Sequence, residues 1–396
     1  MVYKAMVDKQ KYIELIQKNI GKHIYIYGAG NAAKIVYRLC RENEISIKGF
    51  CVTDTSKNVN VLYDIPVLQF DCLRDEEAVI LIAIIEHGER KIKKYIQENG
   101  NYKIIDLPEN ILDYDEWEEQ RKRNPAMEIT PVIGCSVNCK YCPQKLLLTE
   151  YFKDNKDRQA KMSLDQFKKC VQKLPTNTLI EFAGFVEPFL NEESVDMMYY
   201  ANEMGYKITL FTTLVGLKES QLEKVLKIPF KQVVLHTADA DGYANIPVTE
   251  QYLKKLKRVV EAKKADGTSF VDSANCQSRP HEKVIEVTKG KLSIYCEMSD
   301  RAGNLDNGEG KLLSADVKGE IYCERSHQLN HNILLPDGTV VLCCNDFGMQ
   351  HVLGNLYTDR YEDIMKSEMM RQIKRGMHLD ENIPIICRKC MFAKNM

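Results

Sequence analysis

Three cysteines about one third of the way along the chain have the spacing of a ligand set. Cys135, Cys139 and Cys142 form a Cys-x3-Cys-x2-Cys array between Gly134 and Pro143. A cubane four-iron cluster has four iron corners, so three thiolates leave one iron open to a small molecule, as an open position marks a catalytic zinc site. A zinc site or a reactive thiol group is the alternative, although zinc ligands usually come as paired Cys-x2-Cys or Cys/His units. The array therefore predicts catalytic iron–sulfur chemistry.

The spacing of this array resembles the radical S-adenosylmethionine (SAM) superfamily. In that family the open iron binds the amino and carboxylate groups of SAM. One electron from the cluster then cleaves the sulfonium, and the resulting 5'-deoxyadenosyl radical abstracts a hydrogen atom from the substrate. The resemblance implies a [4Fe–4S] cluster on Cys135, Cys139 and Cys142, SAM as cofactor, and an electron donor such as flavodoxin or ferredoxin.

Further positions that resemble the family follow the later strands. Gly184-Phe-Val-Glu187-Pro is similar to the Gly-x-Gly-Glu-Pro motif that holds the SAM amino group, with Val186 in place of one glycine. Taken alone, a histidine or an aspartate at such loops is more often a structural residue or a helix cap. The resemblance implies SAM contacts at Tyr141, Gly184, Glu187, Thr212, His236 and Asp239.

A second group of cysteines lies in the last quarter of the chain. Cys323-x14-Gly338-x4-Cys343 matches the opening signature of the SPASM domain, an auxiliary iron–sulfur extension of many radical SAM enzymes. With Cys387 and Cys390 it supplies four thiols, enough for one fully ligated auxiliary [4Fe–4S] cluster, which resembles the shorter twitch form. A tetrahedral zinc site on the same four residues is the alternative.

The N-terminal segment carries a glycine turn between a strand and a helix. The apolar run His23–Tyr27 leads directly into Gly28-Ala-Gly30, and Asp54 ends a second strand at the position of a ribose-binding acid. Glycines there allow a phosphate to approach the helix N-terminus. The segment also resembles the N-terminal nucleotide-fold domains of bacterial sugar-modifying enzymes. It predicts a Rossmann-like domain that either binds a nucleotide or nucleotide sugar or serves as a scaffold.

The order of predicted elements assigns the chain to the α/β class. Alternating strands and helices in the middle segment predict a parallel sheet or open barrel, and the resemblance implies a partial (β/α)6 radical SAM barrel. We predict four segments: a Rossmann-like domain at 1–112, a charged linker at 113–126, the barrel at 127–300 and a SPASM/twitch-like domain at 301–396. The six barrel strands are expected near 128–133, 178–183, 206–211, 231–237, 268–275 and 292–298.

Composition restricts the classes of function. The 396 residues carry 55 Lys and Arg against 56 Asp and Glu, with no long basic tract, which argues against a general nucleic-acid or anionic-membrane surface. No apolar run reaches the roughly 18 residues of a membrane span. We find no secretory signal, so the 14 cysteines indicate metal or redox chemistry in a reducing, cytoplasmic compartment.

These features predict a radical SAM enzyme with an oxidoreductase, epimerase or dehydratase outcome. Electron transfer to the auxiliary cluster would give oxidation, and expulsion of a hydroxyl would give dehydration. A hydrogen atom returned by a cysteine would give epimerisation, with Cys276, Cys296 and Cys344 as candidate donors. The nucleotide fold favours a small, sugar-like substrate, and a peptide is the alternative because many SPASM-type enzymes modify peptides.

Overall fold

The computed structural model describes residues 11–55, 61–84, 89–106, 124–288, 291–292, 294–296, 299, 301–305 and 317–395. The chain divides into two compact units, Met1–Glu119 and Gln120–Met396. Of the linker predicted at 113–126, only residues 124–126 lie within the described part.

The first unit is built on a six-stranded sheet with the strand order β3-β4-β2-β1-β5-β6. All neighbouring strands pair in parallel except β3 and β4, which form an antiparallel pair. The strands are β1 (His23–Tyr27), β2 (Gly49–Val52), β3 (Val61–Leu62), β4 (Ile65–Gln69), β5 (Ala78–Ile82) and β6 (Lys103–Ile105).

Both faces of this sheet are covered by apolar side chains. Successive residues of a strand point to opposite faces, so Ile24 and Ile26 of β1 enter one core cluster and Tyr25 and Tyr27 enter the other. Helix α2 (Asn31–Glu42) contributes to the first cluster, and α3 (Glu89–Glu98) contributes Ile96 to the second. The strand, glycine turn and helix order therefore folds as the predicted doubly wound, Rossmann-like unit.

The second unit contains a nine-stranded sheet with the order β12-β11-β10-β9-β8-β7-β14-β15-β16. From β7 to β12 each strand pairs in parallel with the next one along the chain, as a partial (β/α)6 barrel requires. These six strands are β7 (Ala126–Ile129), β8 (Leu179–Phe182), β9 (Lys207–Thr212), β10 (Gln232–His236), β11 (Ser273–Cys276) and β12 (Ile294–Cys296).

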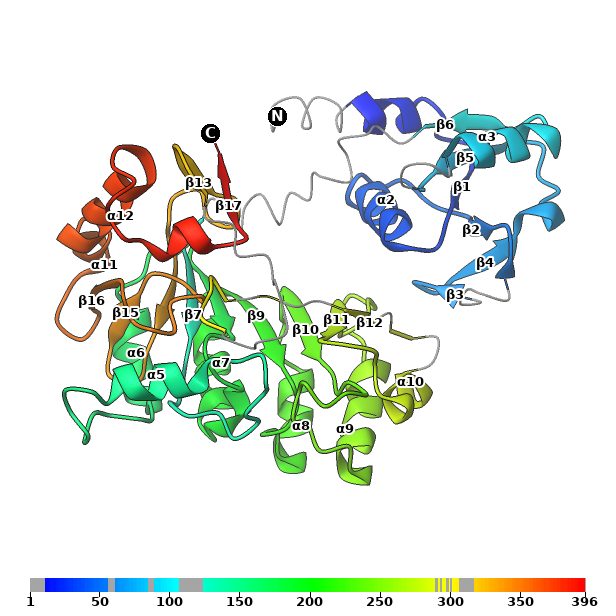
Figure 1. Ribbon diagram of the computed structural model, residues 1–396. Helices are drawn as coiled ribbons and strands as arrows, with labels where there is room; N and C mark the ends of the chain where they lie inside the picture. The colour runs from blue at the N-terminus through cyan, green and yellow to red at the C-terminus, as the bar shows by residue number, and fades with distance from the viewer. Residues whose placement is uncertain are drawn as a thin grey trace. The chain divides into compact units, whose positions relative to one another are not determined.

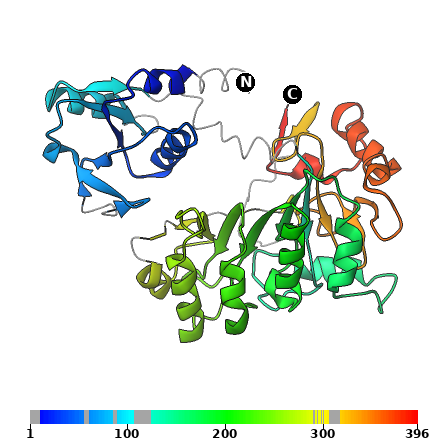
Figure 2. The same cartoon turned by 180° about the vertical axis from the view of Figure 1, so that it is seen from behind.

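Helices follow the strands and gather along one side of the sheet (Figures 1 and 2). Helix α6 (Leu164–Val171) begins with a capping box: the Ser163 hydroxyl accepts from the Gln166 amide, and the Gln166 side chain accepts from the Ser163 amide. The helices are α5 (Gln144–Tyr151), α6 (Leu164–Val171), α7 (Ser194–Glu203), α8 (Glu219–Leu226), α9 (Glu250–Glu261) and α10 (Glu282–Thr288).

The C-terminal segment extends the same sheet. Strand β14 (His331–Leu334) pairs in parallel with β7, and β15 (Thr339–Val341) and β16 (Val352–Asn355) continue it as an antiparallel edge. The sheet therefore crosses the boundary predicted at residue 300. The other elements of this C-terminal segment are β13 (Ile321–Cys323), which pairs antiparallel with β17 (Ala393–Asn395), the helices α11 (Tyr361–Ile364) and α12 (Glu368–His378), and the 3-10 turn η5 (Ile386–Lys389).

None of the helices in the described part of the chain has the length and apolarity that crossing a membrane requires.

Candidate active site and auxiliary cysteine site

The first cysteine array forms a loop that follows β7, the first barrel strand. All three thiols are half-buried, and two turns shape the loop, with Asn138 N donating to Cys135 O and Cys142 N to Cys139 O. Burial raises the pKa of all three thiols, that of Cys142 to about 11, and the neighbouring thiols raise the values of Cys139 and Cys142 further. Metal ligands are thiolates, so a cation bound here must displace protons from these groups.

Two side chains of the loop region face these thiols. The phenol of Tyr141 is hydrogen-bonded to Cys139, and burial raises the pKa of Tyr141. The side-chain amide of Gln144 donates to Cys142 Sγ at 3.5 Å and to the Phe185 carbonyl. The array is thus packed against the loop that follows β8.

Glu187 lies beside Cys135 and is almost fully buried. The charge and backbone of Glu187 both influence the pKa of the Cys135 thiol. Its carboxylate accepts from Thr212 Oγ1 (2.8 Å), from the Thr213 amide and hydroxyl (both 2.6 Å) and from the Phe189 amide (3.3 Å). Burial is the largest effect and raises the pKa of Glu187. The structure therefore brings Glu187 and Thr212 together at the first cysteine, with Thr212 as a partner of the carboxylate.

Position 184 requires a glycine, both because of its backbone conformation and because of the atoms around it. Its φ is +66°, and a Cβ at this position would lie 2.3 Å from Thr130 Oγ1. The Gly184 amide donates to Glu128 Oε2 at 3.0 Å. The loop after β8 is therefore anchored to β7 immediately before the cysteine array.

His236 and Asp239, two of the predicted SAM contacts, hold neighbouring parts of the barrel. Asp239 accepts from the amides of Tyr243 (2.9 Å) and Ala244 (2.7 Å), and the Tyr243 carbonyl accepts from the Lys140 amide inside the cysteine loop. His236 Nδ1 is hydrogen-bonded to Asn275 Oδ1, and its ring stacks on Phe211. Asp239 thus shapes a loop that supports the array, and His236 lies at the carboxyl end of β10.

The four predicted auxiliary ligands line one cavity. Cys323 ends β13, Cys343 follows β15, Cys387 lies within η5 and Cys390 directly follows it. Burial is the largest effect on Cys343 and Cys387 and raises both pKa values, and the surrounding thiols raise them further. The Asn345 side chain donates to Cys390 Sγ at 3.3 Å. Residues that are 67 positions apart in sequence, Cys323 and Cys390, therefore lie at one site.

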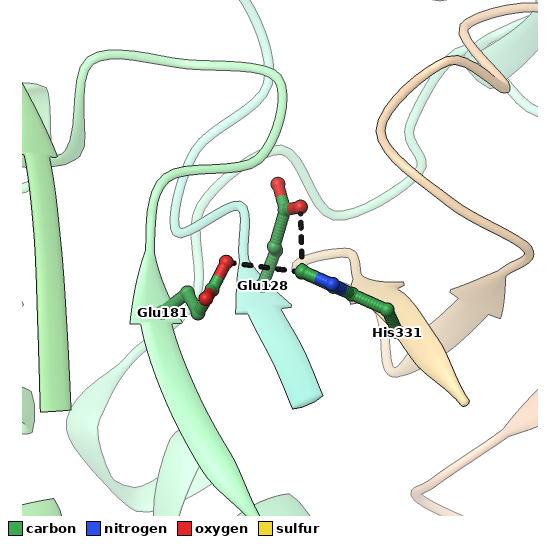
Figure 3. A group of neighbouring side chains, drawn as sticks. All are labelled: Glu128, Glu181 and His331. Atoms are coloured by element: carbon green, nitrogen blue, oxygen red, sulfur yellow. Dashed lines mark hydrogen bonds and ion pairs between the residues drawn. The ribbon is translucent and has the colours of Figure 1, made fainter. Parts of the chain in front are cut away.

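A buried polar cluster adjoins this cavity and was not predicted. Glu128 on β7, Glu181 on β8 and His331 on β14 converge, and His331 Nε2 lies 3.0 Å from a carboxylate oxygen of each glutamate (Figure 3). Arg325 Nη2 pairs with Glu128 at 2.7 Å. Burial alone would raise the pKa of Glu128, but Arg325 and His331 hold it below its usual value. The sequence feature that could have indicated this cluster is a single acidic residue inside each of two apolar strands, Glu128 in Met-Glu-Ile and Glu181 in Ile-Glu-Phe.

The three candidate hydrogen donors lie at different places. Cys344 is buried at the auxiliary cavity and accepts from Arg325 Nη1 at 2.7 Å, and burial raises its pKa to about 12. Cys276 ends β11 and donates to the Ser278 carbonyl at 2.7 Å. The backbone of Cys296 pairs with that of Cys276 at the end of β12, and its side chain lies outside the described residues.

The glycine turn of the first unit lies at the carboxyl edge of β1, between β2 and β5. Gly28 has a φ of +125°, and a Cβ there would lie 2.7 Å from the Ala83 carbonyl, whereas a Cβ at Gly30 would meet no atom within 4 Å. Gly30 precedes α2, and Asp54 follows the neighbouring strand β2. This is the point at which strand order reverses, where doubly wound sheets bind ligands.

Residues 323–391 match the SPASM family, described as an iron-sulfur cluster-binding domain. The matched segment contains the four cysteines that line the auxiliary cavity. The SPASM-type domain predicted from the cysteine spacing is therefore confirmed. No curated protein matches the chain in sequence.

Several solved structures are similar to parts of the chain. BtrN in complex with AdoMet and 2-DOIA shares 15% identity with a TM-score of 0.44, covering 69% of this chain and 94% of BtrN. Streptococcus suis SuiB bound to precursor peptide SuiA shares 14% identity with a TM-score of 0.41, covering 76% and 81%. Native anSMEcpe with bound AdoMet and Cp18Cys peptide shares 17% identity with a TM-score of 0.40, covering 67% and 86%. At these identities and TM-scores the similarity says nothing about what this chain binds.

Proposed function

We propose that this protein is a radical SAM enzyme that cleaves SAM reductively and abstracts a hydrogen atom from a small, sugar-like substrate. One observation supports this most: the Cys-x3-Cys-x2-Cys loop follows the first strand of a six-stranded parallel partial barrel, and that barrel shares its sheet with the SPASM segment. Active sites of such barrels gather at the carboxyl ends of the strands.

Cys135, Cys139 and Cys142 would hold a [4Fe–4S] cluster. When bound, that cluster with SAM supplies the reducing electron and the 5'-deoxyadenosyl radical, and a donor such as flavodoxin or ferredoxin would deliver the electron. The role of the protein's own residues would be to bind and orient the cluster and SAM. Tyr141 packs at the second thiol, and Glu187 offers a buried carboxylate beside the first. Charge-assisted contact with an ammonium group is the role that this carboxylate would serve.

The auxiliary cysteines suit a cluster better than a single zinc ion. A tetrahedral zinc ion with Zn–S bonds of about 2.3 Å would bring its sulfurs to roughly 3.8 Å from one another. Within the described residues, the only group of three or more potential ligands whose atoms all lie within 4.8 Å is Glu128, Glu181 and His331. The auxiliary thiols line a cavity instead of meeting at one point, which favours a larger cofactor between them.

The substrate assignment depends on the first unit. Its glycine turn, the open space at Gly30 and the reversal of strand order at β1 suit a diphosphate-containing nucleotide. A nucleotide sugar is therefore favoured, with oxidation, epimerisation or dehydration at the sugar as the outcome. Modification of a peptide is the alternative that the substrate test must distinguish.

The experiment is anaerobic reconstitution followed by reduction in the presence of SAM. We expect 5'-deoxyadenosine and methionine as products, and we expect Cys135→Ala, Cys139→Ala and Cys142→Ala each to abolish them, because each residue holds the cluster that delivers the electron. Cys276→Ala is the matched control and should retain SAM cleavage in the absence of substrate. Formation of 5'-deoxyadenosine by the three cysteine variants would overturn the proposal.

A further inference from the structure

Arg325 lies between the auxiliary cysteines and the barrel. It follows Cys323 by two residues, and its Nη1 donates to the thiol of Cys344, which is the neighbour of Cys343 in the chain. The guanidinium also lies over the ring of Phe392, 5.8 Å from its centroid, and its charge influences the pKa of Cys390. A fixed positive charge is therefore in place at the wall of the cavity that the four ligand cysteines line.

Buried partners hold this guanidinium in position. Glu128 Oε1 accepts from Arg325 Nη2 at 2.7 Å and lies 3.0 Å from His331 Nε2, while Glu128 Oε2 accepts from the Gly184 amide. Glu181 contacts the same histidine nitrogen from the next strand at 3.0 Å (Figure 3). Glu128, Glu181 and His331 are almost fully buried, so their charges are weakly screened and their positions are fixed, whereas the Arg325 side chain is 28% exposed at the cavity.

The charged side chains of this network lie at different distances from the cavity. Arg325 and Glu128 line the cavity, whereas Glu181 is absent from its described lining and lies behind His331. Addition of an electron makes a cluster more negative, and the potential of an iron–sulfur cluster depends on nearby charge and hydrogen bonds. A positive charge at the wall favours the reduced form, and the buried carboxylates oppose it.

We propose that Arg325, held by Glu128, His331 and Glu181, is a positioning residue that raises the reduction potential of the auxiliary cluster and so makes it an electron acceptor. This inference rests on the proposed function. In the oxidative outcome the substrate gives one hydrogen atom to the 5'-deoxyadenosyl radical, one electron to the auxiliary cluster and one proton to solvent. The substrate thereby loses two electrons and two protons in all.

The test is a redox titration of the full-length reconstituted protein, followed by electron paramagnetic resonance. The auxiliary signal is the one that does not change when SAM is added. We expect Arg325→Gln to lower its midpoint potential and Glu181→Gln to raise it, because the first removes a positive charge and the second a negative one. Arg360→Gln is the control, since Arg360 forms an exposed ion pair with Asp363 on the same segment and its loss should leave the potential unchanged.

The opposite signs expected for the potential shifts of Arg325→Gln and Glu181→Gln distinguish an electrostatic role of these residues from a merely structural one. Should Arg325→Gln fail to retain iron, Arg325→Lys keeps the charge and should retain a potential close to that of the wild type, and Glu181→Gln still tests the sign. Unshifted potentials, or shifts of the same sign, in variants that retain the auxiliary iron would overturn the inference. Zinc or no metal at the auxiliary site of the wild type would overturn this inference together with the auxiliary-cluster assignment, and would leave SAM cleavage at the first cluster unaffected.

Discussion

At the scale of single residues, buried glutamates occur in two settings in this barrel, one in a loop motif and the other inside apolar strands. Glu187 follows a glycine motif and was predicted from it, whereas Glu128 and Glu181 lie inside apolar strands and were not. A local motif identifies a residue whose neighbours in sequence are also its neighbours in space. The partners of Glu128 are Arg325 and His331, about 200 positions away, and no short-range pattern reveals them.

Replacing Glu187 by Gln should weaken SAM binding. The carboxylate would contribute a charge-assisted contact of ~1.5 to 3 kcal/mol to the SAM ammonium group, and Gln lacks that charge. Gln also replaces one carboxylate oxygen, a hydrogen-bond acceptor, by an NH2 donor that faces the Thr213 amide or the Thr212 hydroxyl. The free energy of unfolding should therefore fall by about 1 to 3 kcal/mol. Anaerobic calorimetry with SAM measures the affinity, and thermal unfolding measures the stability.

Thr213→Val is the matched control for this variant. It removes one hydroxyl donor to Glu187 but leaves the carboxylate and the Thr213 amide in place, so SAM affinity should change much less. Unchanged SAM affinity in folded Glu187→Gln protein would show that residues 184–188 do not bind SAM.

Thiols of the first unit should differ sharply in reactivity. Cys40 and Cys51 are buried, and burial raises both pKa values to about 12, so both remain protonated at pH 8, while Cys72 is exposed. The thiolate is the nucleophile. Brief alkylation of the native protein at pH 8, read by mass spectrometry, should modify Cys72 and spare the other two. Their labelling should rise only as pH approaches 12 or as the protein unfolds, and equal labelling of all three at pH 8 would contradict the fold of this unit.

At the scale of elements, the positions of the buried strands could be predicted from their apolar sequence pattern. The pairing between strands far apart in the sequence could not. The six barrel strands occur near their predicted positions because short apolar runs bounded by turns identify buried parallel strands. The pairing of β14 with β7 joins segments about 200 residues apart and depends on the tertiary fold. For this reason the predicted boundary at residue 300 cuts through what is one sheet.

The loop after β8 offers a test of this arrangement at Gly184. Gly184→Ala places a Cβ 2.3 Å from Thr130 Oγ1 and also adopts a φ of +66°, whereas Gly205→Ala meets no atom within 4 Å at a φ of +83°. The left-handed conformation alone costs about 1 to 2 kcal/mol. Gly184→Ala should therefore lower the thermal midpoint clearly more than Gly205→Ala does. Equal effects of the two substitutions would show that the Thr130 contact is not as described.

At the scale of the whole molecule, we propose that chemistry and substrate recognition depend on different units. The glycine turn and the first cysteine array could be predicted from short-range spacing, the fold class from the order of elements, and the auxiliary cysteines from the Cys323-x14-Gly338-x4-Cys343 signature and the Cys387–Cys390 pair. The substrate could not, because it depends on side chains from many loops whose juxtaposition no local pattern encodes. The division of the chain at Glu119 allows the nucleotide hypothesis to be tested without disturbing the barrel.

The full-length protein should bind a nucleotide sugar, and Gly30→Asp should abolish that binding. The new side chain has open space, so the fold should persist, but its volume and charge would occupy the phosphate position at the start of α2. Titration calorimetry with nucleotide sugars and with NAD compares the ligands, and SAM cleavage without substrate should survive as the internal control. If no nucleotide binds, the first unit is a scaffold and a peptide substrate becomes the favoured one.

The central claim is that the chain holds two clusters, one with an iron open to SAM and one fully ligated. The most direct measurement is electron paramagnetic resonance of the reduced Cys387→Ala/Cys390→Ala variant, recorded with and without SAM. We predict that this variant keeps about four irons of about eight, and that its signal changes when SAM is added, because SAM binds the open iron of the cluster on Cys135, Cys139 and Cys142. A retained four-iron signal that is identical with and without SAM would contradict the account.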